Sequence, residues 1–326
     1  MSEVNVTILL AGVVAGAAPI VLAALGETIT EKAGVINLAL DGTILLSAMV
    51  AFVVAFKTNS ILMGFAGAAV AGAVVAAIVA FFSIYLNQSQ VAVGFVLTLM
   101  TRDLAYFLGN SYTRLQGPQV VLLPLPFLKN IPVLGPVFFY QSLPVYFSLS
   151  MIAFCWWYLY KTPLGLQLRS VGEHPGAAYA RGIDPKKLQM FYSMCGGLLV
   201  GLAGATFSLA VKPGWGRPQG AEGTGWIALV LVIFGGWNPL KAAMGAYLFS
   251  FLQVMGIYCQ EWLPSVPAQV FQVAPFPLMI FTLLVMSLAQ KESVQNWAED
   301  NPRIKSIVAF LAGTVPTALG KPYRPD

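Results

Sequence analysis

Two polar side chains, Asn37 and Asp41, lie inside an apolar stretch and are the strongest candidates for chemistry in this sequence. Their spacing predicts that they share one face of a helix, at positions i and i+4. An ionisable side chain within a membrane span is costly and therefore indicates a path for a polar solute. A polar clasp between neighbouring helices is an equal alternative, because it needs the same hydrogen-bonding groups.

The break "FGGWNPLK", residues 234–241, supplies two further path candidates, Trp237 and Asn238. Two glycines and a proline end a helix there, and irregular backbone at membrane depth is tolerated only inside protein or beside water. A purine or pyrimidine base could stack on the Trp237 indole. Tryptophan is more typical of the lipid interface, so we favour an anchoring role but keep both residues as path candidates.

Arg102 and Asp103 are adjacent in another apolar stretch and so point in different directions on a helix. We favour the interpretation that they mark a helix end near the membrane interface. Three glycines, Gly197, Gly201 and Gly204, have a small-residue spacing that lets two helices approach closely. We interpret these glycines as packing positions without chemistry.

The stretch "KTPLGLQLRSVGEHPGAAYARGIDPKKL", residues 161–188, is basic and predicts a short helix from Pro175 to Arg181. Its residue types favour a first helical turn, a helix interior and a helix end. A negative charge precedes this helix and a positive charge ends it, as the helix dipole favours. These residues are Glu173, Pro175, Ala177, Ala178, Arg181 and Gly182. A helix of about 10 Å is marginal in water. The stretch is therefore either gripped by a second protein or a solvated loop that obeys the inside-positive rule.

The composition excludes most soluble classes of protein. Only 10% of the 326 residues are charged and the mean hydropathy is +0.76, whereas a soluble domain is about 25% charged. The net charge of +5 then reports loop orientation rather than nucleic-acid binding. One histidine and three separate cysteines predict no metal site and no disulfide. No phosphate-binding G-x-x-x-x-G-K-S/T loop occurs, so ATP would be bound by a partner, and we expect no cofactor.

A spanning helix needs roughly 20 apolar residues, and such runs recur along the chain. We predict an all-α, polytopic membrane bundle with about nine segments, between roughly eight and ten, some of them broken or re-entrant. The segments are 7–25, 35–56, 61–86, 91–108, 143–160, 188–211, 226–234, 240–258 and 269–288. The seventh is too short to span and is interpreted as a half-helix.

Lysine and arginine concentrate in two segments, 161–187 and the tail after residue 290, which the inside-positive rule places in the cytoplasm. Segment 110–141 and the N-terminus would then face outside. We predict one transmembrane domain over residues 1–290, with the cytoplasmic loop 161–187, and a cytoplasmic tail over residues 291–326.

Three blocks occur in order along the chain: "GETITEKAGVINLALDGTILLSA" at 26–48, "TPLGLQLRSVGEHPGAAYARGI" at 162–183 and "GWIALVLVIFGGWNPLKAAMGAYLF" at 225–249. They resemble the N-terminal, coupling-helix and late helix-break signatures of permease subunits in the ribose and branched-chain amino acid class of ABC importers. The nucleoside-type subgroup is the most similar. The resemblance runs from Gly26 to Leu288, and three spaced blocks make a chance match improbable.

In that family a short cytoplasmic helix docks into the ATPase, and the permease pair tips between outward and inward openings. The resemblance implies these partners: an ATP-binding subunit, a second permease in a heterodimer, an extracytoplasmic substrate-binding lipoprotein and the lipid bilayer. It assigns ATPase docking to Arg169, Gly172, Glu173, His174, Pro175, Ala177, Ala178, Arg181 and Gly182. The charges at the rim of the docking site would be Arg169, Lys186 and Lys187. Gln90 matches a polar position in the family's fourth segment and joins the path candidates.

Two positions depart from the family pattern. His174 replaces a usual Asn, which weakens the helix cap, and Asp41 replaces a usual Glu, which makes the substrate less transferable. We predict a nucleoside importer of the bacterial cell membrane, with a ribose-like sugar importer as the alternative. An ATP-independent secondary transporter would share the hydropathy. A membrane enzyme would need a nucleophile and base, or a metal site. The spans contain no histidine for a triad, which leaves a carboxylate mechanism open.

Overall fold

The chain folds mainly into helices. The computed structural model describes residues 6–126, 128–132, 134–262, 291–298 and 315–321, with the isolated positions 266, 270, 277, 280, 281, 284, 288 and 323. Within these residues the only sheet is the antiparallel pair of β1 (Leu122–Pro124) and β2 (Tyr140–Ser142). Apart from this short pair, the predicted helical membrane bundle is confirmed.

Seven helices in the described residues are long and apolar enough to cross a membrane. They are α1 (Val6–Lys32), α2 (Leu40–Thr58), α3 (Ile61–Ala80), α4 (Gln90–Gly109), α6 (Leu143–Lys161), α9 (Pro185–Thr206) and α11 (Pro239–Trp262). The π-helical turns η1 (Phe81–Tyr85) and η4 (Phe207–Val211) extend α3 and α9. The shorter helices are η2 (Asn110–Tyr112), η3 (Leu128–Asn130), α5 (Leu134–Phe138), α7 (Pro163–Glu173), α8 (Pro175–Ala180), α10 (Thr224–Phe234) and α14 (Glu292–Ala298).

Eight of the nine predicted segments correspond to α1, α2, α3, α4, α6, α9, α10 and α11. The ninth, 269–288, lies outside the described residues except at isolated positions. The second begins at Leu40 and not at Val35, because residues 33–39 form a loop. With 11 residues, α10 is about 16 Å long and too short for about 30 Å of hydrocarbon, so the half-helix prediction fits.

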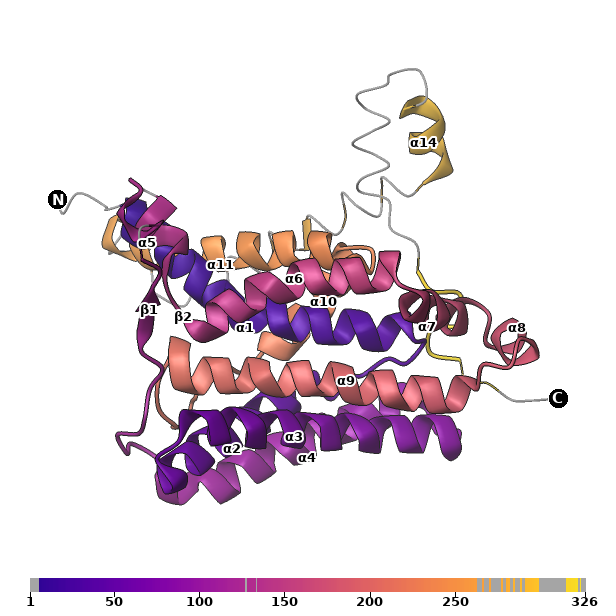
Figure 1. Cartoon of the computed structure of the whole chain (residues 1–326), viewed down its shortest axis with the longest axis horizontal. Coiled ribbons are helices and arrows are strands. Elements are labelled where there is room, and N and C mark those ends of the chain that lie inside the picture. The colour runs from indigo at the N-terminus through magenta and orange to yellow at the C-terminus, as the bar shows by residue number, and fades with distance from the viewer. Residues whose placement is uncertain are drawn as a thin grey trace.

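Helix α1 is the central helix of the bundle, and its second half is almost wholly buried. It packs against α9, α11, α10 and α6. A Cβ atom on Gly26 would lie 2.5 Å from the carbonyl oxygen of Gly196, so only glycine permits the close contact with α9. Figure 1 shows the long helices side by side, with α7 and α8 at one end of the bundle and α5, β1 and β2 at the other.

Short polar side chains set the starts of several helices. Ser89, Thr162 and Asp184 precede α4, α7 and α9, and each accepts a hydrogen bond from an amide in the first turn. Asp184 accepts two such bonds, from Lys186 at 3.1 Å and Lys187 at 3.3 Å. These N-caps satisfy amides that have no partner within the helix.

Candidate functional site

The predicted short helix is present as α8, at the end of the bundle that also holds α7 (Figure 1). His174 occupies its N-cap position without a side-chain hydrogen bond, as expected from the missing Asn. The helix stops at Gly182, whose φ of +83° is left-handed. There the Ile183 amide returns to the Ala178 carbonyl oxygen at 3.1 Å, a common helix ending.

The outward surface of α8 carries no charged side chain. Ala177 and Tyr179 are exposed, whereas Ala178 is only 3% exposed and faces inward. Arg181 is exposed directly after the helix. Arg169 is less accessible than a rim charge would be, because its guanidinium lies 5.2 Å from the centre of the Tyr160 ring.

Glu173 is where the structure departs from the predicted helix. It is the last residue of α7, and its carboxylate accepts hydrogen bonds from the Thr317 amide at 3.0 Å and hydroxyl at 2.8 Å rather than from amides of α8. The Ala318 amide binds the Gly172 carbonyl oxygen at 3.0 Å. Residues 315–321, which we call the C-terminal strap, therefore hold the junction of α7 and α8.

The C-terminal strap also reaches the loop after α1. The Gly320 amide donates to the Gly34 carbonyl oxygen at 3.1 Å. Gly172 itself packs on that loop, since a Cβ atom there would lie 2.1 Å from the Lys32 carbonyl oxygen. Both basic segments of the sequence thus meet on one side of the bundle, while the domain boundary at residue 290 and the cytoplasmic side stay predictions.

Replacing Glu173 with alanine should release the C-terminal strap, because both bonds to Thr317 are lost. We expect the backbone amides of the C-terminal strap to exchange hydrogen for deuterium several-fold faster, since a lost hydrogen bond of about 1 kcal/mol raises an open population roughly fivefold. Glu173→Gln retains one acceptor and should behave in between. Exchange of the strap amides in Glu173→Ala at the wild-type rate would contradict the strap.

Asn37 lies in the loop 33–39 and not on α2, so the predicted helix face shared with Asp41 is wrong. Its side-chain oxygen accepts from the Ala39 amide at 3.0 Å, a local bond that competes with helix formation. The backbone amide of Asn37 donates to the carboxylate of Glu27 at 3.0 Å. Because Glu27 precedes the end of α1 by five residues, the loop turns back about 8 Å into the bundle.

Gln90 and Gln189 hold this loop from two sides. Gln90 is the first residue of α4, is 6% exposed, and accepts from the Ile36 amide at 2.7 Å. The side-chain amide of Gln189 donates to the Ala33 carbonyl oxygen at 3.0 Å. Gln90 therefore supports the loop, and its place on the solute path stays a prediction.

Asp41 lies where two helices begin inside the bundle. Its carboxylate accepts from the Gly225 amide at 3.2 Å, in the first turn of α10, where the helix dipole is positive. A Cβ atom on Gly225 would lie 2.2 Å from the Asp41 nitrogen, so glycine alone allows this contact. Arg102 and Glu222 lie close enough to Asp41 to interact electrostatically. The half-helix α10 thus starts among charged groups, an arrangement that can present polar groups to a solute at membrane depth.

Trp237 is 5% exposed, so the favoured role as a lipid-interface anchor is wrong. Its indole N–H donates to the carboxylate of Glu31. Asn238 accepts from the Leu240 amide at 3.0 Å and so caps the start of α11. These bonds give both residues a structural role, and the geometry offers no open indole face on which a base could stack.

Two buried carboxylates, Glu27 and Glu31, are not among the site residues predicted from the sequence. They lie one turn apart on α1 and are 0% and 2% exposed. Glu27 holds the loop 33–39 through Asn37, and Glu31 holds the helix break through Trp237. The available signal was their spacing of i and i+4 inside an apolar run, since buried carboxylates require partners.

Glu222 organises the loop between α9 and α10. It accepts from the Tyr106 hydroxyl of α4 and from the amides of Gln219 at 2.8 Å and Gly220 at 2.6 Å. Burial raises the pKa of Glu222, but the hydrogen bonds from Tyr106 and the loop amides outweigh it and hold the pKa below its usual value. Glu222 therefore stays charged at neutral pH.

Arg102 and Asp103 lie well inside α4 and are exposed, so the favoured interpretation as a helix end is wrong. Only one stripe of α4 is buried, and it packs mainly on α2. That stripe consists of Gln90, Gly94, Thr98, Thr101, Ala105 and Gly109. The charged pair therefore projects from a span whose other faces are open.

The three packing glycines lie where α9 crosses α3 and α2. A Cβ atom on Gly197 would lie 2.3 Å from the Ala76 side chain, and one on Gly201 would lie 2.2 Å from the Ala68 carbonyl oxygen. On Gly204 it would lie 2.5 Å from the carbonyl oxygen of Ile44. These contacts involve backbone that cannot easily move.

Gly201→Ala should therefore destabilise the bundle by about 1–3 kcal/mol, the usual cost of overpacking. The matched change Gly12→Ala on α1 meets no atom within 4 Å and should be neutral or slightly stabilising. Thermal unfolding in detergent, followed by size-exclusion chromatography, measures the difference. Equal unfolding temperatures for the two variants would contradict the close packing.

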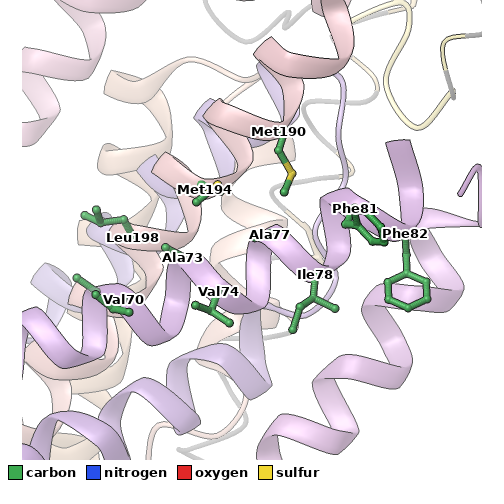
Figure 2. A pocket seen from close by; sticks show the side chains of 11 residues that line it. Val70, Ala73, Val74, Ala77, Ile78, Phe81, Phe82, Met190, Met194 and Leu198 are labelled. Atoms are coloured by element: carbon green, nitrogen blue, oxygen red, sulfur yellow. The ribbon is translucent and has the colours of Figure 1, made fainter. Parts of the chain in front are cut away.

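Two grooves on the bundle are poor candidates for a solute site. The first lies between α3 and α9, and Figure 2 shows only apolar side chains along it. These include Val70, Ile78, Phe81, Met190 and Leu198. The second lies among α3, α6 and α9 and is mainly apolar. Neither groove is lined by a predicted path residue, and apolar surfaces of this kind suit lipid chains.

A helical bundle whose described residues include seven candidate spans, a half-helix starting at buried charges and a short helix at one end defines a multi-pass membrane protein. The family model described as "Branched-chain amino acid transport system / permease component" matches residues 9–283. The chain belongs to this family of ABC transporter permeases. It is therefore the permease component, which works with an ATP-binding subunit and is not itself catalytic.

Several curated proteins are similar over most of the chain. A Haloferax volcanii protein, provisionally named a glucose ABC transporter permease, is 36% identical over 78% of this chain and 78% of its own length. The nucleoside ABC transporter permease of Lactococcus lactis is 30% identical over 94% of this chain and 100% of its own length. The guanosine ABC transporter permease of Bacillus subtilis is 31% identical over 82% of this chain and 88% of its own length. No solved structure matches the chain.

Proposed function

We propose that this chain is the permease subunit of an ATP-driven nucleoside importer of the bacterial cell membrane. The observation that carries the substrate is the full-length similarity to permeases named for nucleoside and guanosine, over 94% and 82% of the chain. In this proposal a second, different permease completes the solute path, and an extracytoplasmic lipoprotein delivers the nucleoside.

The coupling helix of this importer is α8. ATP-driven closure of the ATPase would push on the exposed Ala177 and Tyr179, with Arg181, Lys186 and Lys187 around them. A helix this short cannot transmit force unless it is held. The C-terminal strap and the contact of Gly172 with the Lys32 backbone supply that support.

Force would pass from α8 to the charged junction through the loop 33–39. The C-terminal strap bonds to Gly34, and Asn37 bonds to Glu27 farther inside the bundle. Two residues after Ala39, Asp41 contacts the first turn of α10. We propose that these hydrogen bonds, joined by the backbone of residues 34–41, move the half-helix when the ATPase closes.

Glucose is the second candidate substrate, because a relative at 36% identity carries a glucose permease name. The discriminating experiment is uptake of labelled guanosine into proteoliposomes that contain the complete importer with its binding protein. Excess unlabelled nucleosides should compete, and glucose should not. Competition by glucose alone would replace the nucleoside assignment with the sugar alternative. ATP-independent accumulation by this subunit alone would contradict the importer itself.

A further inference from the structure

Four residues of α4 form one exposed stripe beside the charged junction. Phe95, Leu99, Arg102 and Tyr106 occupy positions i, i+4, i+7 and i+11, which share a helix face. Phe95 and Leu99 are 51% and 47% exposed, Arg102 is exposed and Tyr106 is half-buried. We call these four residues the Arg102 stripe.

The Arg102 stripe is bordered by the half-helix and its preceding loop. The ring of Phe95 lies 6.3 Å from the ring of Trp226 in the first turn of α10. At the other end of the stripe, Tyr106 donates to Glu222, and the guanidinium of Arg217 lies 4.8 Å from the Tyr106 ring centre. The stripe is thus continuous with the groups around Asp41.

Arg102 lies too deep in the span to reach water at either membrane surface by position alone. It is about 18 Å along α4 from Gln90 and about 10 Å from Gly109. It forms no salt bridge within the described residues. An arginine facing hydrocarbon at such depth is strongly unfavourable. The stripe therefore faces water or a polar partner rather than lipid.

We propose that the Arg102 stripe is this subunit's solute-contacting wall of the translocation path. The proposal rests on the proposed nucleoside importer and names residues that its path lacked. The solute that fits is a neutral molecule with an aromatic ring and several hydroxyl groups. Phe95 and Trp226 offer rings for stacking, while Arg102 donates and Glu222 accepts hydrogen bonds. The opposite charges of Arg102 and Asp41 leave the wall without a strong preference for ions.

Cysteine accessibility in the complete importer tests this wall. In a background without Cys155, Cys195 and Cys259, we expect Leu99→Cys to react with a charged, water-soluble thiol reagent. Guanosine, supplied with the binding protein, should slow that reaction. Val70→Cys is the control, because Val70 is 63% exposed in the apolar groove between α3 and α9 and should meet lipid. If Leu99→Cys fails to insert, Phe95→Cys replaces it.

The outcomes separate the wall from the substrate. A Leu99→Cys thiol as unreactive as that of Val70→Cys would overturn the proposal, because the stripe would then face lipid or be sealed against the second permease. Reaction without slowing by guanosine or glucose would also overturn it. Slowing by glucose alone would keep the wall and reject the nucleoside assignment.

Uptake provides an independent measurement. Arg102→Ala should lower guanosine uptake roughly tenfold to a hundredfold, the loss of one hydrogen bond to a charged group. Arg102→Lys should restore part of it, and Val70→Ala should leave uptake unchanged. Arg102→Ala with normal uptake would count against the wall, as would a loss explained wholly by failed assembly of the two permeases.

Discussion

An importer carrying Ala177→Trp should still hydrolyse ATP through its ATP-binding subunits but should take up almost no solute. Ala177 is exposed on α8 and presents only a methyl group, so a bulky indole at this position would prevent docking into a fitted cleft. Loss of a central interface contact costs at least about 2 kcal/mol, which weakens docking by roughly 30-fold or more. Uptake and ATP hydrolysis, measured together in proteoliposomes, give the ratio that should collapse.

Ala177→Ser is the matched control, since it keeps a small side chain at the same position and should preserve uptake. Ala178 is unsuitable for this test because it is 3% exposed, and a large residue there would disturb this subunit's own fold. Normal uptake by well-inserted Ala177→Trp would show that α8 is not the docking helix.

Asp41→Leu should abolish uptake by disconnecting α2 from the half-helix α10. The Gly225 amide loses its acceptor at 3.2 Å, and an unsatisfied buried amide costs about 1–3 kcal/mol. The positive end of α10 also loses its counter-charge, worth about 0.3–2 kcal/mol. Leucine is also larger than aspartate, so overpacking adds to these losses. Uptake, together with thermal unfolding of the purified complex, measures the effect.

Asp41→Asn separates the hydrogen bond from the charge. Its side-chain oxygen can still accept from Gly225, so stability should be largely restored, while the negative charge beside Arg102 is absent. Uptake by this variant then reports the role of the charge in the path. If Asp41→Leu kept both stability and uptake, the junction of α2 and α10 would have no functional part.

The charged interior was only partly predictable because its bonds join residues far apart in the sequence. Asp41 was found as an isolated carboxylate in an apolar run, but its partner Gly225 lies 184 positions away. Trp237 was interpreted as a lipid anchor because its partner Glu31 lies 206 positions away. Asn37 was placed on a helix because local spacing cannot reveal that Glu27 draws its backbone into a loop.

The sequence by itself determined that the chain lies in a lipid bilayer. It also determined the order of the spans, the presence of the half-helix and the short helix flanked by basic residues. Each follows from hydropathy, helix breakers and charge within a window of a few turns, where neighbouring residues act on the same backbone. The tertiary structure decided which polar side chains are buried in hydrogen bonds that hold the bundle together and which are exposed on its surface. It buried Trp237 and Gln90, tied Glu173 to the C-terminal strap and turned Arg102 outward, because side-chain burial depends on how separate helices pack.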